Sequence, residues 1–157
     1  MVADAGAPEP GEVHLDELDR GILTALRRDG RESNSAIAEV LGVTEGTVRQ
    51  RVRKLLDSGV LRIAGLANPE IMAEHQLCVL GLKVDESRRL EQRAREVAAL
   101  AEVQSVAIVT GRYDLLVEVL VPSNHGLIGF LSGPLAGVQG ITSSETFLLL
   151  KTFDKWL

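Results

Sequence analysis

The sequence predicts an α+β protein in which a helical N-terminal domain precedes a domain of alternating strands and helices. Two observations support this prediction. Before Asn68-Pro69, apolar residues recur at the three- and four-residue spacing of helices, and after it short runs of Leu and Val alternate with helical segments. The chain has 157 residues, 45% of them hydrophobic, which is enough for one or two packed domains. Because aromatic residues make up only 3%, we expect cores of Leu, Val, Ile and Ala.

The chain is expected to contain five segments. Residues 1–14 are rich in Ala, Pro, Gly and Glu, a composition typical of a disordered leader. The other boundaries follow the change of pattern: 15–60 form the helical domain, 61–75 a hinge strand and linker, 76–153 the second domain, and 154–157 a C-terminal tail.

Three helices are expected in the first domain, at 16–28, 34–41 and 45–58. The apolar face of the first helix is made of Leu18, Ile22, Leu23 and Leu26, and Gly30 lies beyond its end. The second helix carries its apolar residues at Ala36, Ile37, Val40 and Leu41, and Gly42 stops it. Gly59 suits the left-handed position after the third helix, and 60–66 is predicted to be a short strand.

The second and third helices, joined by a short turn, are expected to form a helix-turn-helix, within a three-helix domain of the winged type. Thr44 is expected to cap the third helix, because its hydroxyl accepts a hydrogen bond from a free backbone N–H. On this helix the apolar face consists of Val48, Val52 and Leu55. The opposite face carries Gly46, Gln50, Arg53 and Lys54, with Arg49 and Arg51 on its flanks and no acidic residue expected after Glu45.

This basic and amide face is what a helix in the DNA major groove requires, although a charged face on an ordinary surface helix would look partly the same. The preceding helix and the glycine turn favour DNA binding. The predicted contact residues are Thr44, Glu45, Gly46, Thr47, Arg49, Gln50, Arg51, Arg53 and Lys54.

The distribution of charge agrees with this hypothesis better than the sum does. The chain has 17 basic and 22 acidic residues, a net charge of −5, which predicts weak non-specific attraction to phosphate. From Arg20 to Arg62, however, there are nine basic and five acidic residues, whereas 69–157 contains eight basic and eleven acidic ones. A basic segment on an acidic body fits a specific DNA binder.

The second domain is expected to have the order βαββαβ. The predicted elements are a strand at 77–84, a helix at 88–100, a strand at 103–110, a turn at Gly111-Arg112, a strand at 113–121, a helix capped by Ser123 and running to about 135, and a strand at 141–153. This order is that of a ferredoxin-like sandwich, an antiparallel sheet with two helices on one face.

Apolar residues occupy both faces of the predicted strands. Leu115, Val117, Val119 and Val121 alternate with Leu116, Glu118 and Leu120. Helices cover only one face, and an open face of this kind would be a large apolar patch. A partner subunit is the simplest cover, which predicts a two-fold homodimer.

Other classes of protein are disfavoured by what the sequence lacks. It has no apolar run long enough to span a membrane and no signal peptide. The single cysteine, Cys78, lies in an apolar run, is expected to be buried, and favours a reducing cytoplasm. His14, His75 and His125 are scattered without metal-ligand spacing, and no phosphate loop or nucleophile elbow is present. We expect no metal, no cofactor and no catalytic activity.

Taken together, residues 15–154 resemble the Lrp/AsnC family of bacterial and archaeal transcription regulators, the feast/famine proteins. The first resembling motifs are Leu15-Asp16 with Asp19 and Ile22-Leu23, and Thr47-Val48-Arg49 through Gly59-Val60. The others are Asn68-Pro69, Thr110-Gly111-Arg112-Tyr113-Asp114, and Gly140-Ile141-Thr142 with Thr146-Phe147. Gly46 departs from the family, in which we expect serine or a similar residue, and costs helix stability by up to ~1 kcal/mol.

The resemblance implies a homodimer that assembles to a tetramer or octamer, a pseudo-palindromic double-stranded operator, and a small-molecule effector such as an amino acid. The implied effector-binding residues are Gly111, Arg112, Tyr113, Asp114, Gly140, Thr142, Ser143 and Ser144. Asp114 would accept from the ammonium group of an amino acid, and hydroxyls or backbone N–H groups would bind its carboxylate.

Other interpretations stay open. Gly111 to Asp114 is also a common composition for a plain strand-connecting turn. Some relatives of this fold decarboxylate tetrapyrroles, although the basic third helix argues against an enzyme here. An architectural DNA-binding protein without an effector is a further alternative.

Overall fold

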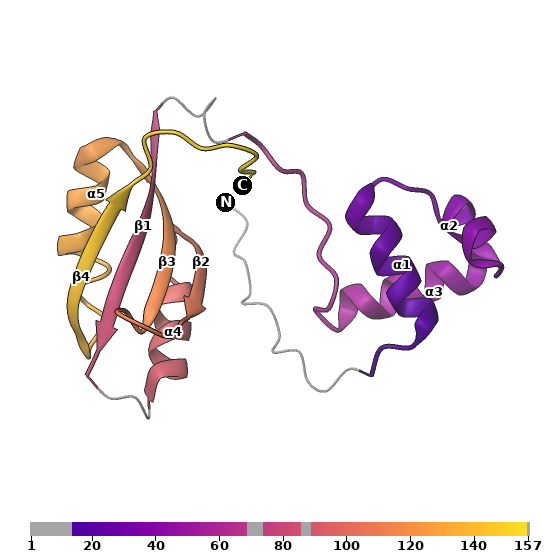
Figure 1. The fold of residues 1–157 in the computed structure, drawn as a ribbon, viewed down its shortest axis with the longest axis horizontal. Helices are drawn as coiled ribbons and strands as arrows, with labels where there is room; N and C mark the ends of the chain where they lie inside the picture. Colours follow the sequence, from indigo (N-terminus) through magenta and orange to yellow (C-terminus); the bar gives the residue numbers. More distant parts are fainter. Residues whose placement is uncertain (1–13, 69–73, 86–88, 157) are drawn as a thin grey trace. The chain divides into compact units, whose positions relative to one another are not determined.

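The computed structural model describes residues 14–68, 74–85 and 89–156, and the predicted leader lies outside these residues except for His14. Figure 1 shows the fold. The chain separates into two compact units, Met1–Gly65 and Leu66–Leu157, which we treat one at a time.

The first unit contains the three predicted helices: α1 (Glu17–Arg28), α2 (Asn34–Leu41) and α3 (Glu45–Asp57). Asp16 caps α1 and accepts from the backbone N–H of Asp19, while the Asp19 carboxylate accepts from the backbone N–H of Asp16. Gly42, at φ +68°, ends α2 in the left-handed conformation, and Gly59 does the same after α3.

The three helices enclose a small apolar core. Its buried residues are Ile22, Leu26, Ile37, Ala38, Val48 and Leu55. Val40 differs from the sequence interpretation, which placed it on the apolar face of α2: its side chain is 76% exposed, and Ala38 is buried instead. A cavity opens beside Val40, between α1 and α2.

The strand predicted at 60–66 is not formed, and the described residues of this unit contain no wing strand. The backbone N–H of Leu61 instead donates to the carbonyl of Leu55 in α3. Ile63 and Leu66 are exposed. A strand needs a paired neighbour for its backbone groups, and none of the described strands pairs with this segment.

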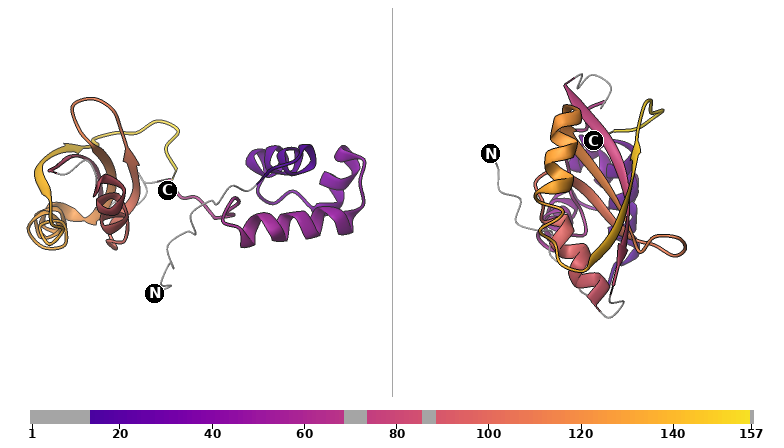
Figure 2. Two further views of the ribbon diagram at one scale, coloured as in Figure 1. Left: turned by 90° about the horizontal axis from the view of Figure 1, so that it is seen from below. Right: turned by 90° about the vertical axis from the view of Figure 1, so that its left-hand side faces the viewer.

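The second unit has the predicted βαββαβ order. Its elements are β1 (His75–Val84), α4 (Leu90–Ala98), β2 (Val103–Ile108), β3 (Leu115–Pro122), α5 (Ser123–Ser132) and β4 (Ile141–Leu148). The strands form one antiparallel sheet in the order β2-β3-β1-β4. Both helices lie on the same face of this sheet (Figure 2). This arrangement confirms the predicted ferredoxin-like sandwich.

The core of the second unit lies between the sheet and the two helices. Val97 of α4 and Phe130 of α5 pack against alternate residues of the two central strands, which are Leu80, Leu82, Leu115, Val117, Val119 and Val121. Cys78 is fully buried, as predicted, and burial raises the pKa of its thiol.

Several element ends differ from the prediction. β3 begins at Leu115 rather than at 113, although the backbone of Asp114 is already bonded to Leu82 and Val109. Ser123 is not the cap of α5 but its first residue, and Pro122 stands at the cap position. β4 stops at Leu148 rather than at 153. The side-chain amide of Gln76 donates to the carbonyl of Leu149, and the chain then leaves the edge of the sheet.

The sheet face opposite the helices carries apolar side chains, with the carboxylates of Glu118 and Glu145 among them. Strand pairing places Val79 between Glu118 and Phe147, and Gly81 between Leu116 and Glu145. The C-terminal segment crosses part of this face, because Lys155 is ion-paired with Glu118 of β3 (Figure 1).

Candidate functional sites

The start of α3 is fixed by local hydrogen bonds. The Thr44 hydroxyl accepts from the backbone N–H of Thr47 at 3.2 Å, as the sequence predicted for an N-cap, and lies 2.9 Å from the Thr47 hydroxyl. Gly46 stands in the exposed first turn, and a methyl group there would meet only the Thr44 hydroxyl oxygen, at 3.9 Å. The helix therefore begins with its unpaired N–H groups at the surface.

The outer face of α3 carries the amide and basic groups. Val48 and Leu55 are buried, whereas Gln50, Arg53 and Lys54 are exposed. The Arg53 side chain is 84% exposed, and its Nε lies 4.0 Å from an oxygen of Asp57. Asp57 is an acid that the sequence interpretation overlooked on this face.

The two flanking arginines behave differently. Arg49 is ion-paired with Glu45 one turn earlier, and both side chains are largely exposed. Arg51 instead turns toward α1, where its Nη1 donates to Asp16 at 2.6 Å and to Asp19 at 3.0 Å.

This pair of carboxylates dominates the electrostatics around Arg51. The hydrogen bond from the backbone N–H of Asp19, followed by that from Arg51, lowers the pKa of Asp16. The two carboxylates raise the pKa of Arg51. Asp19 is only 3% exposed, so its charge needs the guanidinium. Arg51 is thus engaged between helices, unlike the other basic residues of α3.

The turn implied as an effector site has its own internal contacts. The Asp114 carboxylate accepts from the backbone N–H of Val84 at 2.9 Å and so holds the end of β1. The Tyr113 ring lies directly on Gly81, where a Cβ atom would come within 2.7 Å of the ring. Gly111 has a φ of +115°, a conformation that favours glycine.

A residue of β4 that sequence reasoning missed, Glu145, joins this turn to the last strand. Its carboxylate accepts from the Tyr113 hydroxyl and pairs with the Arg112 guanidinium at 3.1 Å. The hydrogen bond to Glu145 raises the pKa of Tyr113. Arg112 also lies over the Tyr113 ring, 5.4 Å from its centroid. In the sequence, the only nearby indication that Glu145 belongs to a site is that it is a single acidic residue among Ser and Thr residues of a predicted strand.

The hydroxyl residues of β4 lie elsewhere. Thr142, Ser143 and Ser144 line a hollow of about 230 Å³, together with apolar residues at and after the end of α5, which are Leu131, Leu135, Ala136 and Val138. The Thr142 hydroxyl donates to the carbonyl of Lys83 at 3.3 Å. The structure thus brings Arg112 and Tyr113 to Glu145, and separates them from this hollow.

Gly140 is explained by its neighbours. A Cβ atom there would meet Asp85 at 2.7 Å and the Nε of Arg93 at 3.1 Å, and its φ is +81°. Its carbonyl accepts from the backbone N–H of Asp85. Gly140 therefore allows these two side chains to pack at the start of β4.

Two further observations concern sites of other kinds. Within residues 14–68, 74–85 and 89–156, no group of three or more His, Cys, Asp or Glu side chains is placed to hold a metal ion. In the same part of the chain, every helix is too short or too polar to cross a bilayer.

Comparisons with known proteins agree with both units. Residues 15–56 match the model of the AsnC-type helix-turn-helix domain, and residues 77–155 match that of the Lrp/AsnC ligand binding domain. An uncharacterized HTH-type transcriptional regulator of Pyrococcus furiosus is 41% identical over 143 residues, which is 90% of this chain and 95% of that protein.

Solved structures are similar over nearly the whole chain. The structure of Escherichia coli AsnC has a TM-score of 0.66 and 26% identity, covering 89% of this chain and 95% of that one. The complex of a Neisseria meningitidis transcriptional regulator with L-Met has a TM-score of 0.69 and 22% identity, covering 90% of this chain and 94% of that one.

Proposed function

The chain belongs to the Lrp/AsnC family of transcriptional regulators, and from this premise we propose how it reads DNA and what it senses. The family supplies the general function: a DNA-binding transcriptional regulator whose second domain responds to a small molecule.

We propose that α3 enters the major groove, with Gln50 and Arg53 contacting base edges and Arg49 and Lys54 contacting phosphates. The observation that carries this proposal is the division of α3 into a buried apolar face and an exposed face of amide and basic groups. Arginine offers two donors that match guanine, and glutamine matches adenine. The start of the helix, Thr44 to Thr47, lies nearest the DNA in this arrangement.

Arg51 receives another role in this proposal. Its Nη1 already bonds Asp16 and Asp19, and its side chain is less exposed than that of Arg53. We therefore assign Arg51 to holding α1 against α3, in place of the DNA contact predicted for it from the sequence.

A DNA-binding experiment tests the assignment. With the DNA upstream of the chain's own gene, Arg53→Ala should lose ~1–3 kcal/mol of binding free energy and relax base preference, because it removes a base contact. Lys54→Ala should weaken binding to all sequences alike. Arg95→Ala, the same charge change on α4, is the control. Wild-type affinity and selectivity in Arg53→Ala would refute the assignment.

We propose that the effector is an α-amino acid or a related metabolite, bound around β4. The hydroxyls of Thr142, Ser143 and Ser144 in the hollow are suited to a carboxylate. The carboxylates of Glu145 and Asp114 are suited to an ammonium group, and within one subunit Glu145 lies apart from the hollow, in the cluster with Arg112 and Tyr113. Arg112, Tyr113 and the glycines Gly111 and Gly140 shape the neighbouring loops. A regulator of the same fold has been solved with L-Met, which agrees with this ligand class.

Coupling between the two domains provides the test. If an amino acid changes the protein's affinity for operator DNA by some factor, operator DNA must change the protein's affinity for that amino acid by the same factor. Calorimetry with each amino acid, with and without DNA, measures both. Ser144→Val, a change in the hollow, should weaken ligand binding and leave the DNA affinity measured without ligand unchanged. If no ligand alters DNA binding, the architectural alternative is correct, and tetrapyrrole binding would support the enzyme alternative.

We propose that the chain acts in the cytoplasm without a cofactor or catalytic activity, as a homodimer that assembles to a tetramer or octamer on a pseudo-palindromic operator. The family supports the regulatory role, and the apolar open face of the sheet supports the dimer. Two-fold symmetry in the protein matches two-fold symmetry in the DNA.

A further inference from the structure

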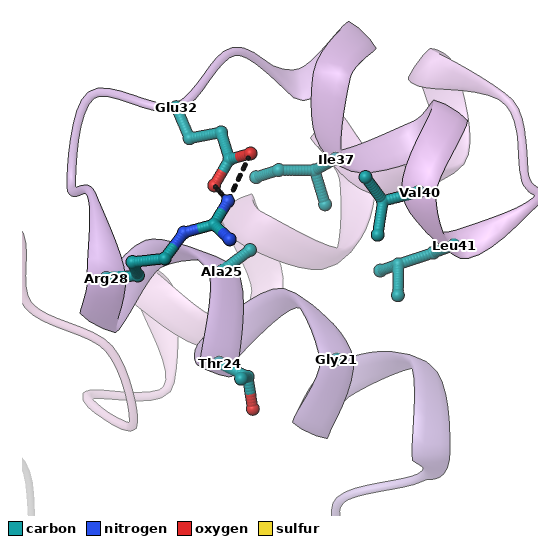
Figure 3. A pocket seen from close by; sticks show the side chains of 8 residues that line it. All are labelled: Gly21, Thr24, Ala25, Arg28, Glu32, Ile37, Val40 and Leu41. Carbon is teal, nitrogen blue, oxygen red and sulfur yellow. Dashed lines mark hydrogen bonds and ion pairs between the residues drawn. The ribbon is translucent and has the colours of Figure 1, made fainter.

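A cavity in the DNA-binding unit takes no part in the function proposed above. It lies between α1 and α2 and has a volume of about 350 Å³ (Figure 3). Its walls are apolar, formed by Ala25 of α1 and by Ile37, Val40 and Leu41 of α2. This volume falls in the range of pockets that bind small molecules.

One end of the cavity carries a pair of opposite charges. The Nη2 atom of Arg28 donates to both oxygens of Glu32, at 3.1 and 3.2 Å (Figure 3). The Nε and Nη1 atoms of Arg28 have no acceptor among the residues that the structure describes, and the side chain is 76% exposed. Glu32 is 15% exposed, and each of its oxygens retains a further lone pair. Free donors and free acceptors therefore stand side by side at the end of an apolar space.

We propose that this cavity binds a free α-amino acid with a branched or aromatic apolar side chain, at a site separate from the effector site around β4. The apolar side chain would fill the space between the helices. The carboxylate would accept from the free donors of Arg28, and the ammonium group would donate to Glu32.

The charge pair selects for a molecule with both charges. A simple carboxylic acid brings a second carboxylate toward Glu32, and a simple amine brings a second cation toward Arg28. Each of these is repelled by one member of the pair, whereas a zwitterion satisfies both. Charge complementarity thus identifies the ligand class.

Binding here reaches the DNA-binding helix through the core. Ile37 and Ala38 of α2 belong to the same buried cluster as Val48 and Leu55 of α3. A ligand that joins α1 to α2 stabilises the arrangement in which α3 is held. The site would therefore sense an amino acid within the DNA-binding unit itself.

The test uses the full-length protein with labelled Ile, Leu and Val methyl groups, observed by NMR. Three probes share one isobutyl group: leucine, 4-methylpentanoate without the ammonium group, and 3-methylbutylamine without the carboxylate. Leucine should shift the methyl signals of Ile37, Val40 and Leu41 with saturation, and each singly charged probe should bind at least about tenfold more weakly. Equal binding of all three, or no saturable shift with leucine, overturns the proposal.

Matched variants locate the binding. Arg28→Gln should weaken leucine binding about tenfold. Arg27→Gln should not weaken it, because Arg27 is an exposed neighbour that does not line the cavity. Val40→Glu changes an exposed wall residue, so it should spare the fold and weaken binding. Equal leucine affinity in Arg28→Gln and Arg27→Gln would refute the charge-pair assignment.

A last variant separates this site from the one around β4. In Ser144→Val, the leucine shifts in the first unit should persist. If they vanish, they were transmitted from the other domain, and this proposal fails while the proposed function stands. If the methyl shifts depend on the protein concentration rather than on the leucine concentration, a second copy of this chain occupies the cavity, and the proposal also fails.

Discussion

Arg51 and Arg53 show how neighbours decide what one type of side chain does. Among the residues that the structure describes, Arg53 has a single weak partner, Asp57, at 4.0 Å, and an exposed pair of this kind contributes little to stability. Arg51 bonds two carboxylates of α1, one of them buried. Removing Arg51 would leave Asp19 as a buried charge without its cationic partner, which is destabilising. Arg53 is therefore free to contact DNA, whereas Arg51 is needed by the fold.

The Asp16 pair predicts how the first unit responds to acid. The Asp19 backbone N–H and the Arg51 guanidinium lower the pKa of Asp16 below its ordinary value of 3.8. The stabilisation is thus present above the unfolded-state pKa and is lost as pH falls through the lower folded-state pKa. Asp16→Asn should reduce the free energy of unfolding at neutral pH and approach the wild type in strong acid.

Denaturant unfolding, followed by the methyl signal of Ile37 from neutral pH to below about pH 3, measures this effect. Glu39→Gln, which changes an exposed acid of α2, should follow the wild-type profile. An Asp16→Asn profile parallel to that of the wild type over the whole range would contradict the prediction.

At the scale of elements, local chemistry predicted the helix ends better than the strand ends. Thr44 and Gly42 act on backbone groups a few residues away, so their roles can be read from the sequence. The residue after the end of β4 is bonded by Gln76, which is remote in sequence. The predicted strand at 60–66 does not form, because none of the described strands pairs with it. Glu145 was missed for the same reason, since its partners Arg112 and Tyr113 come from another part of the chain.

Gly46 allows a prediction about α3 as an element. Glycine costs a helix up to ~1 kcal/mol relative to alanine, and a methyl group at this position meets nothing closer than 3.9 Å. Gly46→Ala should therefore raise the free energy of unfolding by up to ~1 kcal/mol. Gly42→Ala, the same chemical change at φ +68°, should lower it because alanine is strained there. Urea unfolding of both variants measures these changes in the free energy of unfolding. A destabilised Gly46→Ala would show that the first turn of α3 has no room for a methyl group or is not helical.

At the scale of the whole molecule, the two units present surfaces of different kinds. The first offers an exposed basic and amide face on α3, and the second a partly apolar sheet face opposite its helices. On that sheet, Leu116 and Phe147 are 36% and 44% exposed, and Leu120 lies beside them on β3. A regulator that reads a two-fold operator needs two copies of the first surface, and the proposed pairing through the second surface would supply them.

The dimer prediction follows from this sheet face. An isologous contact would bury Val79, Leu116 and Phe147 against their symmetry mates, so we expect a dimer at micromolar concentration in sedimentation and light scattering. Leu116→Lys should shift the equilibrium toward monomer and weaken operator binding, because it places a charge in the centre of the contact.

Ile128→Lys is the matched control: Ile128 is 66% exposed on α5, on the side of the sheet that the helices cover, and the same change there should leave the mass unaltered. Circular dichroism of both variants verifies that each is folded. A wild-type monomer, or a Leu116→Lys protein with the wild-type mass, would show that this face is not the dimer contact. If the mass of the wild type then rises with an amino acid while that of Leu116→Lys stays small, the larger assembly is built from dimers, since it forms only when the dimer contact is intact.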